Sequence, residues 1–155
     1  MSRQWKIQAD DGDHFRLAFD KPGTWSQKYN LVWDKVLDMV LFEKDIAEKE
    51  VKWYLSHQNK FGLPLDNRAD YTKADWITWT ATLSDSPEEF RHFMETMRAF
   101  TTSTTDRVPF SDWYDTRTAR QTGFQARSVV GGIYMKMLAD PGTWKKWRSW
   151  RPQEE

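Results

Sequence analysis

Four aspartates stand beside tryptophans, and this pairing is the feature of the sequence best suited to chemistry. The candidates are Asp34, which follows Trp33, Asp75, which precedes Trp76, and Asp112 and Asp115, which flank Trp113 and its neighbour. An acid against an aromatic wall can have a raised pKa and then serves as a general acid or base. Two such acids about 5–9 Å apart across a cleft would suit glycoside hydrolysis. The four aspartates are therefore candidate catalytic residues.

Each of these aspartates also has a purely structural interpretation. Asp34 lies opposite an apolar helical stripe and fits a solvated helix face. Asp75 can close a capping box with Thr72, whose hydroxyl would cap the amide of residue 75 while the carboxylate reaches back. Asp112 and Asp115 can cap a short turn. The sequence leaves both interpretations open.

Basic residues gather in two further places. Arg117, Arg120 and Arg127 flank a long loop, where they can clamp a carboxylate in bidentate fashion or anchor the loop to nearby aspartates. Residues 144–151 interleave Trp with Lys and Arg, a pattern of single-stranded nucleic-acid binding. The helical spacing of these tryptophans, and a chain with 23 basic and 23 acidic residues, favour a packed or partly exposed terminal helix instead.

Several classes of function have no support in the sequence. The chain has no cysteine, which excludes a disulfide framework, a cysteine zinc site and a cysteine nucleophile. His14, His57 and His92 show no metal-ligand spacing, and neither a glycine-rich phosphate loop nor a nucleophile elbow is present. No stretch of about 18 apolar residues occurs. We therefore expect a small-molecule substrate, with no metal or other cofactor, no nucleic-acid partner and no membrane partner.

The elements that must position these residues are predicted to be helices. The chain has 155 residues, enough for one domain with a sizeable core, and 15% of them are aromatic. Residues 1–25 are expected to be irregular, with a weak strand at 14–19, and 106–126 to form a long loop of the kind that often carries function. Apolar spacing predicts six helices, at about residues 26–41, 43–58, 72–83, 86–101, 128–139 and from 140 onward.

Local signals mark where some of these helices begin. Thr72 opens the capping box, and Ser86 and Asp140 each place a capping residue directly before a proline. Gly131 and Gly132 interrupt the fifth helix, at a cost of about 1 kcal/mol each relative to alanine. Close helix packing, or approach of the backbone to a ligand, is needed to compensate.

These elements predict an all-α fold class. Six helices in sequence form three antiparallel hairpins, which suit either a small bundle or half of an α/α toroid of six hairpins. Residues 1–155 are expected to form a single domain, as a fragment of a larger one. An isolated half-toroid would expose the apolar faces meant for the missing hairpins, so we also expect self-association.

Five segments of the sequence resemble, in order, the glutaminase A family. They are residues 20–35, 60–66, 71–76, 110–116 and 123–132, and the similarity extends over about residues 13–138. These segments are long and rich in Trp, so the resemblance is specific. One position departs from the pattern, because Ser128 stands where the family has Pro. This departure affects a helix start and no chemistry.

The resemblance implies part of a six-helical-hairpin domain that hydrolyses L-glutamine to L-glutamate and ammonia. Since only the C-terminal part of that domain is matched, the remainder of a parent chain is an expected partner. Family members are usually exported, although no signal peptide begins this chain. On this hypothesis Trp33, Trp76 and Trp113 line the pocket. One of the four aspartates polarises water or holds the substrate's amine, and Arg127 binds its α-carboxylate.

Two other hypotheses are open. The parent can be a glycoside hydrolase or a sugar-binding protein, because aromatic walls and acids suit sugar rings equally well. Alternatively, the segment is a scaffold that packs against the rest of its parent and carries no chemistry. Six-hairpin folds are shared with sugar-cleaving enzymes, and a fold alone does not determine the reaction.

Overall fold

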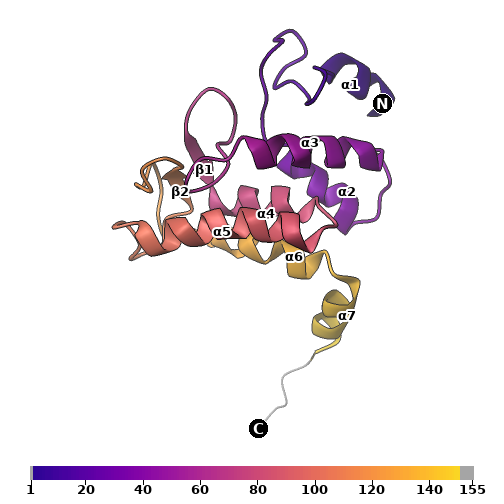
Figure 1. The fold of residues 1–155 in the computed structure, drawn as a ribbon. Helices are drawn as coiled ribbons and strands as arrows, with labels where there is room; N and C mark the ends of the chain where they lie inside the picture. The colour runs from indigo at the N-terminus through magenta and orange to yellow at the C-terminus, as the bar shows by residue number, and fades with distance from the viewer. Residues whose placement is uncertain (1, 151–155) are drawn as a thin grey trace.

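A computed structural model describes residues 2–150 of the chain (Figure 1). In this part the chain forms seven α-helices, two 3-10 helices and two short strands. The α-helices are α1 (Ser2–Ala9), α2 (Val32–Val36), α3 (Lys44–Ser56), α4 (Ala74–Thr82), α5 (Pro87–Ser103), α6 (Met135–Leu138) and α7 (Pro141–Ser149). The 3-10 helices are η1 (Tyr29–Leu31) and η2 (Ser128–Tyr134), and the strands are β1 (Tyr71–Lys73) and β2 (Trp113–Asp115). The prediction of a mainly helical fold is confirmed, with a small sheet added.

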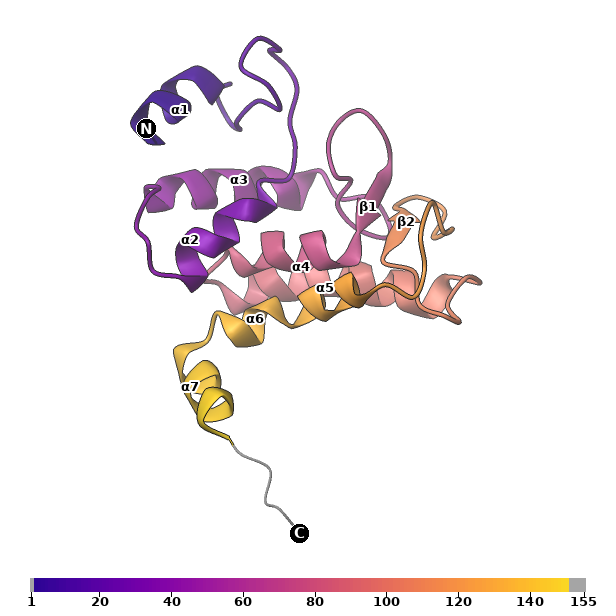
Figure 2. The same cartoon turned by 180° about the vertical axis from the view of Figure 1, so that it is seen from behind.

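Helix α4 is the centre of this fold. It lies beside α5, and the segment formed by η2 and α6 runs along it, as Figure 2 shows, while η1 also contacts it. Its Ile77 is fully buried in a core that includes Tyr54 of α3, Phe93 and Phe100 of α5, and Tyr114 of β2. The buried threonine hydroxyls of α4 all donate hydrogen bonds to protein oxygens, which offsets the cost of burying them.

The N-terminal 25 residues contain a helix, so the prediction of irregular structure there is wrong for α1. Trp5 of α1 packs against Phe15 and Phe42, with ring centroids 4.9 Å and 5.6 Å away. These contacts are tertiary, which is why a short helix of weak local pattern forms here. The weak strand predicted at 14–19 reduces to one isolated bridge between Asp10 and Phe15.

The helix predicted at 26–41 is much shorter in the structure, where only residues 29–36 are helical. The carboxylate of Asp34 accepts hydrogen bonds from the backbone N–H groups of Leu41 (2.8 Å) and Phe42 (3.1 Å), which folds the intervening residues into a turn. The apolar spacing continues past the real end of the helix, and its last members are exposed. A side chain that bonds to backbone N–H groups competes with the helix here.

The predictions for α3, α5 and α7 agree closely with the structure. Ser86 Oγ accepts a hydrogen bond from the N–H of Glu89 (3.3 Å) at the start of α5. The carboxylate of Asp140 accepts one from the N–H of Thr143 (2.6 Å) at the start of α7. Both predicted caps are therefore confirmed.

The small sheet replaces the helix start predicted at Thr72. Strands β1 and β2 are antiparallel, and their register pairs Thr72 with Tyr114 and Lys73 with Trp113. Thr72 is thus a buried strand residue, and Lys73 occupies the N-cap position of α4 without a side-chain capping bond. The predicted capping box between Thr72 and Asp75 is wrong, because strand pairing fixes the backbone of residues 71–73.

The C-terminal segment lies partly at the surface. The helix predicted at 128–139 is mostly a 3-10 helix, in which Met135 is buried while Tyr134 and Met137 are exposed. The tryptophans of α7 are about half exposed, as a terminal helix at the edge of the fold allows. Arg151, the last residue of the basic and aromatic stretch, lies outside the described residues. None of the helices in the described part has the length and apolar character needed to cross a bilayer.

Candidate active site

The small sheet brings two of the predicted aspartates to one place. The backbone N–H of Ala74 donates to the carbonyl oxygen of Asp112 (2.8 Å), which joins the start of α4 to the residue before β2. Asp75 lies in the first turn of α4, near enough for the charge of Asp112 to raise its pKa. Both residues are buried, with 4% of Asp75 and none of Asp112 exposed. We call Asp75 and Asp112 the acid pair.

Asp75 has a carboxylate oxygen without a partner. In the described structure its Oδ1 is buried and makes no hydrogen bond. Burial raises the pKa of Asp75 above its ordinary value, a backbone hydrogen bond from Trp76 lowers it in part, and the charge of Asp112 raises it further. A buried carboxyl with a raised pKa and an unbonded oxygen is suited to taking up and returning a proton.

Asp112 is paired instead. It accepts two hydrogen bonds from Arg127, from Nε to Oδ1 at 3.2 Å and from Nη2 to Oδ2. This bidentate contact neutralises the buried carboxylate, and it raises the pKa of Arg127. Arg127 is thus committed to Asp112, and Arg117 and Arg120 anchor their loop through ion pairs with other aspartates.

A row of aromatic side chains borders the acid pair. Tyr29 stacks on Trp76, with centroids 4.4 Å apart and planes at 5°, and it lies 6.1 Å from Trp79. Trp79 meets Trp33 edge to face at 5.3 Å. Burial raises the pKa of Tyr29, and the charge of Asp75 raises it further, which places the phenol near the acid pair. Trp33, Trp79, Tyr29 and Trp76 form what we call the aromatic row.

Trp113, the third predicted wall residue, joins this row through Lys73. The Lys73 Nζ atom lies 4.5 Å from the ring centroid of Trp76 and 4.7 Å from that of Trp113. The Trp113 ring also packs against two other rings. It lies edge to face with Tyr71, with ring centroids 5.7 Å apart, and its centroid is 6.0 Å from that of Phe124. The indoles of Trp76 and Trp113 thus hold one ammonium group between them.

Two glycines allow close packing at this site. A Cβ atom on Gly132 would lie 2.6 Å from the Asp75 Cβ atom, and one on Gly123 would lie 2.0 Å from the Trp113 ring. The indole N–H of Trp79 also donates to the Gly132 carbonyl oxygen (3.1 Å). The sequence analysis gives two ways to offset the cost of glycine in this helix, and for Gly132 the structure shows the first of them, close packing.

Asp34 and Asp115 lie away from the acid pair. Asp34 holds the turn after α2, and Asp115 Oδ1 accepts hydrogen bonds from the N–H groups of Arg117 (2.9 Å) and Thr118 (2.8 Å). Burial alone would raise the pKa of Asp115, but these hydrogen bonds lower it overall. Both carboxylates are used in building loops, and a catalytic role for either stays a prediction.

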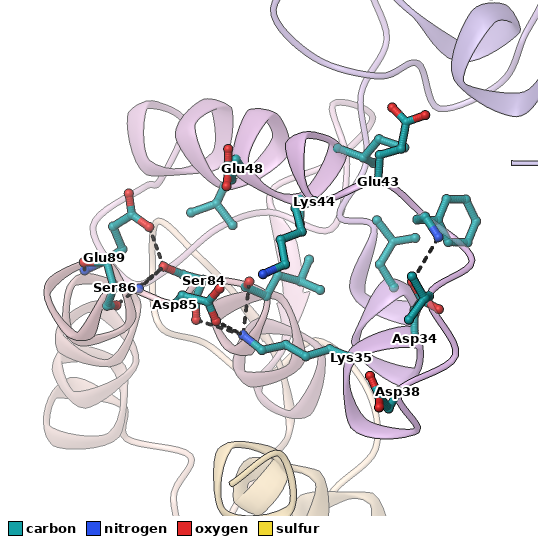
Figure 3. A pocket seen from close by; sticks show the side chains of 17 residues that line it. Asp34, Lys35, Asp38, Glu43, Lys44, Glu48, Ser84, Asp85, Ser86 and Glu89 are labelled. Atoms are coloured by element: carbon teal, nitrogen blue, oxygen red, sulfur yellow. Dashed lines mark hydrogen bonds and ion pairs between the residues drawn. The ribbon is translucent and has the colours of Figure 1, made fainter. Parts of the chain in front are cut away.

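A groove of about 460 Å³ lies between α2, α3 and the turn from α4 to α5 (Figure 3). Of the predicted site residues, Asp34 alone lines it. The Lys35 ammonium donates there to the carbonyl oxygen of Thr82 (2.9 Å) and to Asp85 Oδ1 (2.8 Å). None of the buried unpartnered polar atoms of the described residues lines this groove. We therefore place the candidate site at the acid pair rather than in the groove.

The sequence prediction overlooks Lys73, Tyr29 and Trp79. Tyr29 and Trp79 lie on apolar helical stripes and are predicted to be core residues. Lys73 lies inside the segment interpreted as a capping box, and that interpretation gives no role to its side chain. One further sequence signal lies near these three residues, the Gly131–Gly132 pair, because Gly132 packs against Asp75.

Comparison with known proteins defines the class of this protein. A family model described as "Glutaminase A six helical-hairpin domain" matches residues 1–137. The chain belongs to this family, which confirms the resemblance found in the sequence. The matched region contains the acid pair, Arg127 and the whole aromatic row.

Two curated relatives of known source are similar in sequence to this chain. Glutaminase A of Aspergillus oryzae is 31% identical over 129 residues, covering 81% of this chain and 18% of the relative. A probable glutaminase of Arthroderma benhamiae is 29% identical over 156 residues, covering 80% of this chain and 18% of the relative. The chain thus spans about a fifth of the length of these relatives. No solved structure matches it.

Proposed function

We propose that this chain supplies part of the active site of a glutaminase A-like amidohydrolase, which converts L-glutamine and water to L-glutamate and ammonia. One observation supports this most directly. A buried carboxyl, Asp75, keeps an unbonded oxygen beside an acid that Arg127 has already neutralised. Structural acids in the same fold, such as Asp34 and Asp115, have their oxygens hydrogen-bonded to nearby backbone instead.

In this proposal Asp75 acts as the general base and then as the general acid. Its carboxylate takes a proton from water as the water oxygen attacks the carboxamide carbon of glutamine. The same proton passes to the amide nitrogen, the carbon–nitrogen bond breaks, and ammonia leaves. Burial is the main cause that keeps the pKa of Asp75 high, and the carboxylate of Asp112, held in place by Arg127, raises it further. Trp76 and Trp113 form the walls.

The same proposal includes the shape of the complete domain. The helices of this chain would form consecutive hairpins of a six-hairpin toroid, and the rest of the parent chain would complete the pocket beside the acid pair. The short span of the chain relative to its relatives supports this arrangement. An exported parent is part of the proposal, because members of the family are usually exported.

The test is ammonia release from L-glutamine by the full-length protein that contains this segment. Asp75→Asn keeps the shape of the side chain and removes the titrating oxygen. We expect its turnover to fall by about 100-fold or more, the usual range for loss of a general acid or base. Asp85→Asn is the matched control, because Asp85 lies beyond the opposite end of α4 with its side chain 81% exposed. It should retain turnover.

Three outcomes would contradict this function. Unchanged turnover in Asp75→Asn would remove Asp75 from the mechanism. Equal losses in Asp75→Asn and Asp85→Asn would point to a general structural effect. Hydrolysis of aryl glycosides, with no release of ammonia from glutamine, would favour the glycoside hydrolase hypothesis, for which the aromatic row is equally suitable.

A further inference from the structure

Lys73 is a cation held by aromatic rings and bonded to nothing else. Its ammonium lies over the rings of Trp76 and Trp113, at 4.5 Å and 4.7 Å from their centroids. Within residues 2–150 it makes neither an ion pair nor a hydrogen bond. Lys35, by contrast, donates to several carbonyl oxygens and to a carboxylate.

The surroundings of Lys73 favour an anion. Lys73 is the N-cap residue of α4, and its own side chain makes no capping hydrogen bond. The positive end of the helix dipole therefore points to the same place as the ammonium. Two acids lie near this point. The charge of Asp112, across the sheet, is balanced by Arg127. The pKa of Asp75 is raised by burial, although the charge of Lys73 lowers it in part.

Two indole rings also make the ammonium a better anion ligand. They fix the end of a flexible side chain, so less conformational entropy is lost when a ligand binds. They also exclude water from part of the ammonium, and a charge contact in a less polar environment is stronger than the same contact in water. A carboxylate approaching the acid pair would meet this prepared cation beside the reacting group.

We propose that Lys73 binds the α-carboxylate of an amino-acid substrate, with Trp76 and Trp113 holding its ammonium in position. This inference rests on the proposed function and names the part of the substrate that the site recognises. It takes the role that the sequence prediction gave to Arg127. Arg127 is unsuited to that role, because its Nε and Nη2 atoms already donate hydrogen bonds to buried Asp112.

The first experiment measures binding by the full-length protein that contains this segment, because the rest of the parent completes the pocket. It uses isothermal titration calorimetry on the Asp75→Asn variant, which keeps Lys73 and slows turnover. The probes are L-glutamine, glutaramate, which keeps a carboxylate and a carboxamide, and L-glutaminamide, in which the α-carboxylate is an amide. We expect glutamine and glutaramate to bind saturably. L-Glutaminamide should bind about tenfold more weakly or worse, through loss of one charged contact.

Variants of Lys73 separate a ligand role from a structural one. Lys73→Met should weaken glutamine binding about tenfold or more and leave the weak binding of L-glutaminamide unchanged, while Lys73→Arg should restore part of the loss. Lys60→Met is the matched control, because the Lys60 ammonium also lies over a ring, that of Phe61 (4.8 Å), away from the site. In the full-length protein, Lys73→Met should raise KM for glutamine more than it lowers kcat.

The outcomes distinguish this inference from the proposed function. In the full-length protein with Lys73 intact, no saturable binding of either carboxylate probe, or equal binding of L-glutamine and L-glutaminamide, would overturn the role of Lys73 even if Lys73→Met failed to fold. Asp75-dependent ammonia release with an unchanged KM in Lys73→Met would also overturn it and leave the proposed function standing. Lys73-dependent carboxylate binding without ammonia release would support the anion site and contradict the glutaminase reaction.

Discussion

The two ends of helix α4 are built in opposite ways. At the C-terminal end, Lys35 donates to the carbonyl oxygens of Thr82 and Ser84 and to Asp85, and Lys136 also donates to Ser84. Cations there offset the negative end of the helix dipole, and the acid involved is exposed. Every polar group named at this end has a partner, which is the usual state of a stabilising contact.

At the N-terminal end the pattern is reversed. Asp75 is buried with an unbonded oxygen, and Lys73, the N-cap residue, is held by rings without an ion pair or a capping hydrogen bond. An unpaired buried polar group costs free energy, so this end of the helix lacks the stabilising contacts of the other end. The comparison teaches that the candidate site is defined by a combination, a buried carboxylate oxygen without a hydrogen bond beside a cation held between two rings.

The largest expected effect on stability comes from breaking the Asp112–Arg127 pair. Arg127→Met leaves a fully buried carboxylate without its partner, and we expect the free energy of unfolding to fall by about 3 kcal/mol. Lys35→Met, at the other end of α4, should cost about 1 kcal/mol, because it removes hydrogen bonds at a partly exposed site. Urea unfolding of both variants measures the difference. A larger loss for Lys35→Met would reverse the comparison.

The next effect tests the close packing over Asp75. Gly132→Ala places a Cβ atom against Asp75 and the indole of Trp79, and it should lower the free energy of unfolding by about 2 kcal/mol. Gly131→Ala is the matched neighbour, since nothing lies within 4 Å of its added Cβ atom. Thermal unfolding of the pair should show a loss in the first variant and little change in the second. Equal behaviour would mean that Gly132 is not packed in this way.

A smaller effect is expected from Asp34, the candidate acid that builds a loop. Asp34→Ala removes the acceptor for the N–H groups of Leu41 and Phe42, and it should cost about 1 kcal/mol of unfolding free energy. Hydrogen exchange of these two amides should accelerate in the variant. Lost turnover in a full-length protein carrying Asp34→Asn, with those amides still protected, would return Asp34 to the list of catalytic residues.

The smallest expected effect is the pH dependence that Asp75 gives to stability. The folded state holds the proton of Asp75 more tightly than the unfolded chain does, because burial raises its pKa above 3.8. Its contribution to stability is complete below that value and declines as pH rises through the raised pKa. Asp75→Asn should therefore become more stable relative to the unmodified chain between about pH 4 and pH 7. A constant difference, measured by urea unfolding across this range, would contradict the raised pKa.

Part of the candidate site could be predicted from the sequence. Asp75, Asp112, Trp76 and Trp113 are all found by the pairing of acids with tryptophans, and the structure gathers them. The same rule also selects Asp34 and Asp115, because proximity in sequence does not say whether backbone N–H groups will occupy a carboxylate. The strand pairing that sets Lys73 beside Trp113 joins residues distant in the chain, and no local pattern of the sequence reports it.

Two helix starts followed from local chemistry. Ser86 and Asp140 cap their helices as predicted, because a side-chain oxygen and the N–H group three residues later are fixed by the helix itself. The prediction of a helix over residues 26–41 is wrong, because the Asp34 carboxylate accepts hydrogen bonds from the N–H groups of Leu41 and Phe42 and so ends the helix early. Helix α1 was not predicted, because the contacts that stabilise it are made with Phe15 and Phe42, outside the helix.

The sequence by itself determined the family, the mainly helical fold and the acids and tryptophans from which a site could be made. These depend on residue identity and short-range spacing, which any chain displays before it folds. Only the tertiary structure decided which acid keeps an unbonded oxygen, which arginine is already engaged and which lysine lies between two indole rings. Those outcomes depend on how burial and hydrogen-bond partners are shared among distant segments, and that distribution exists only once the segments have packed together.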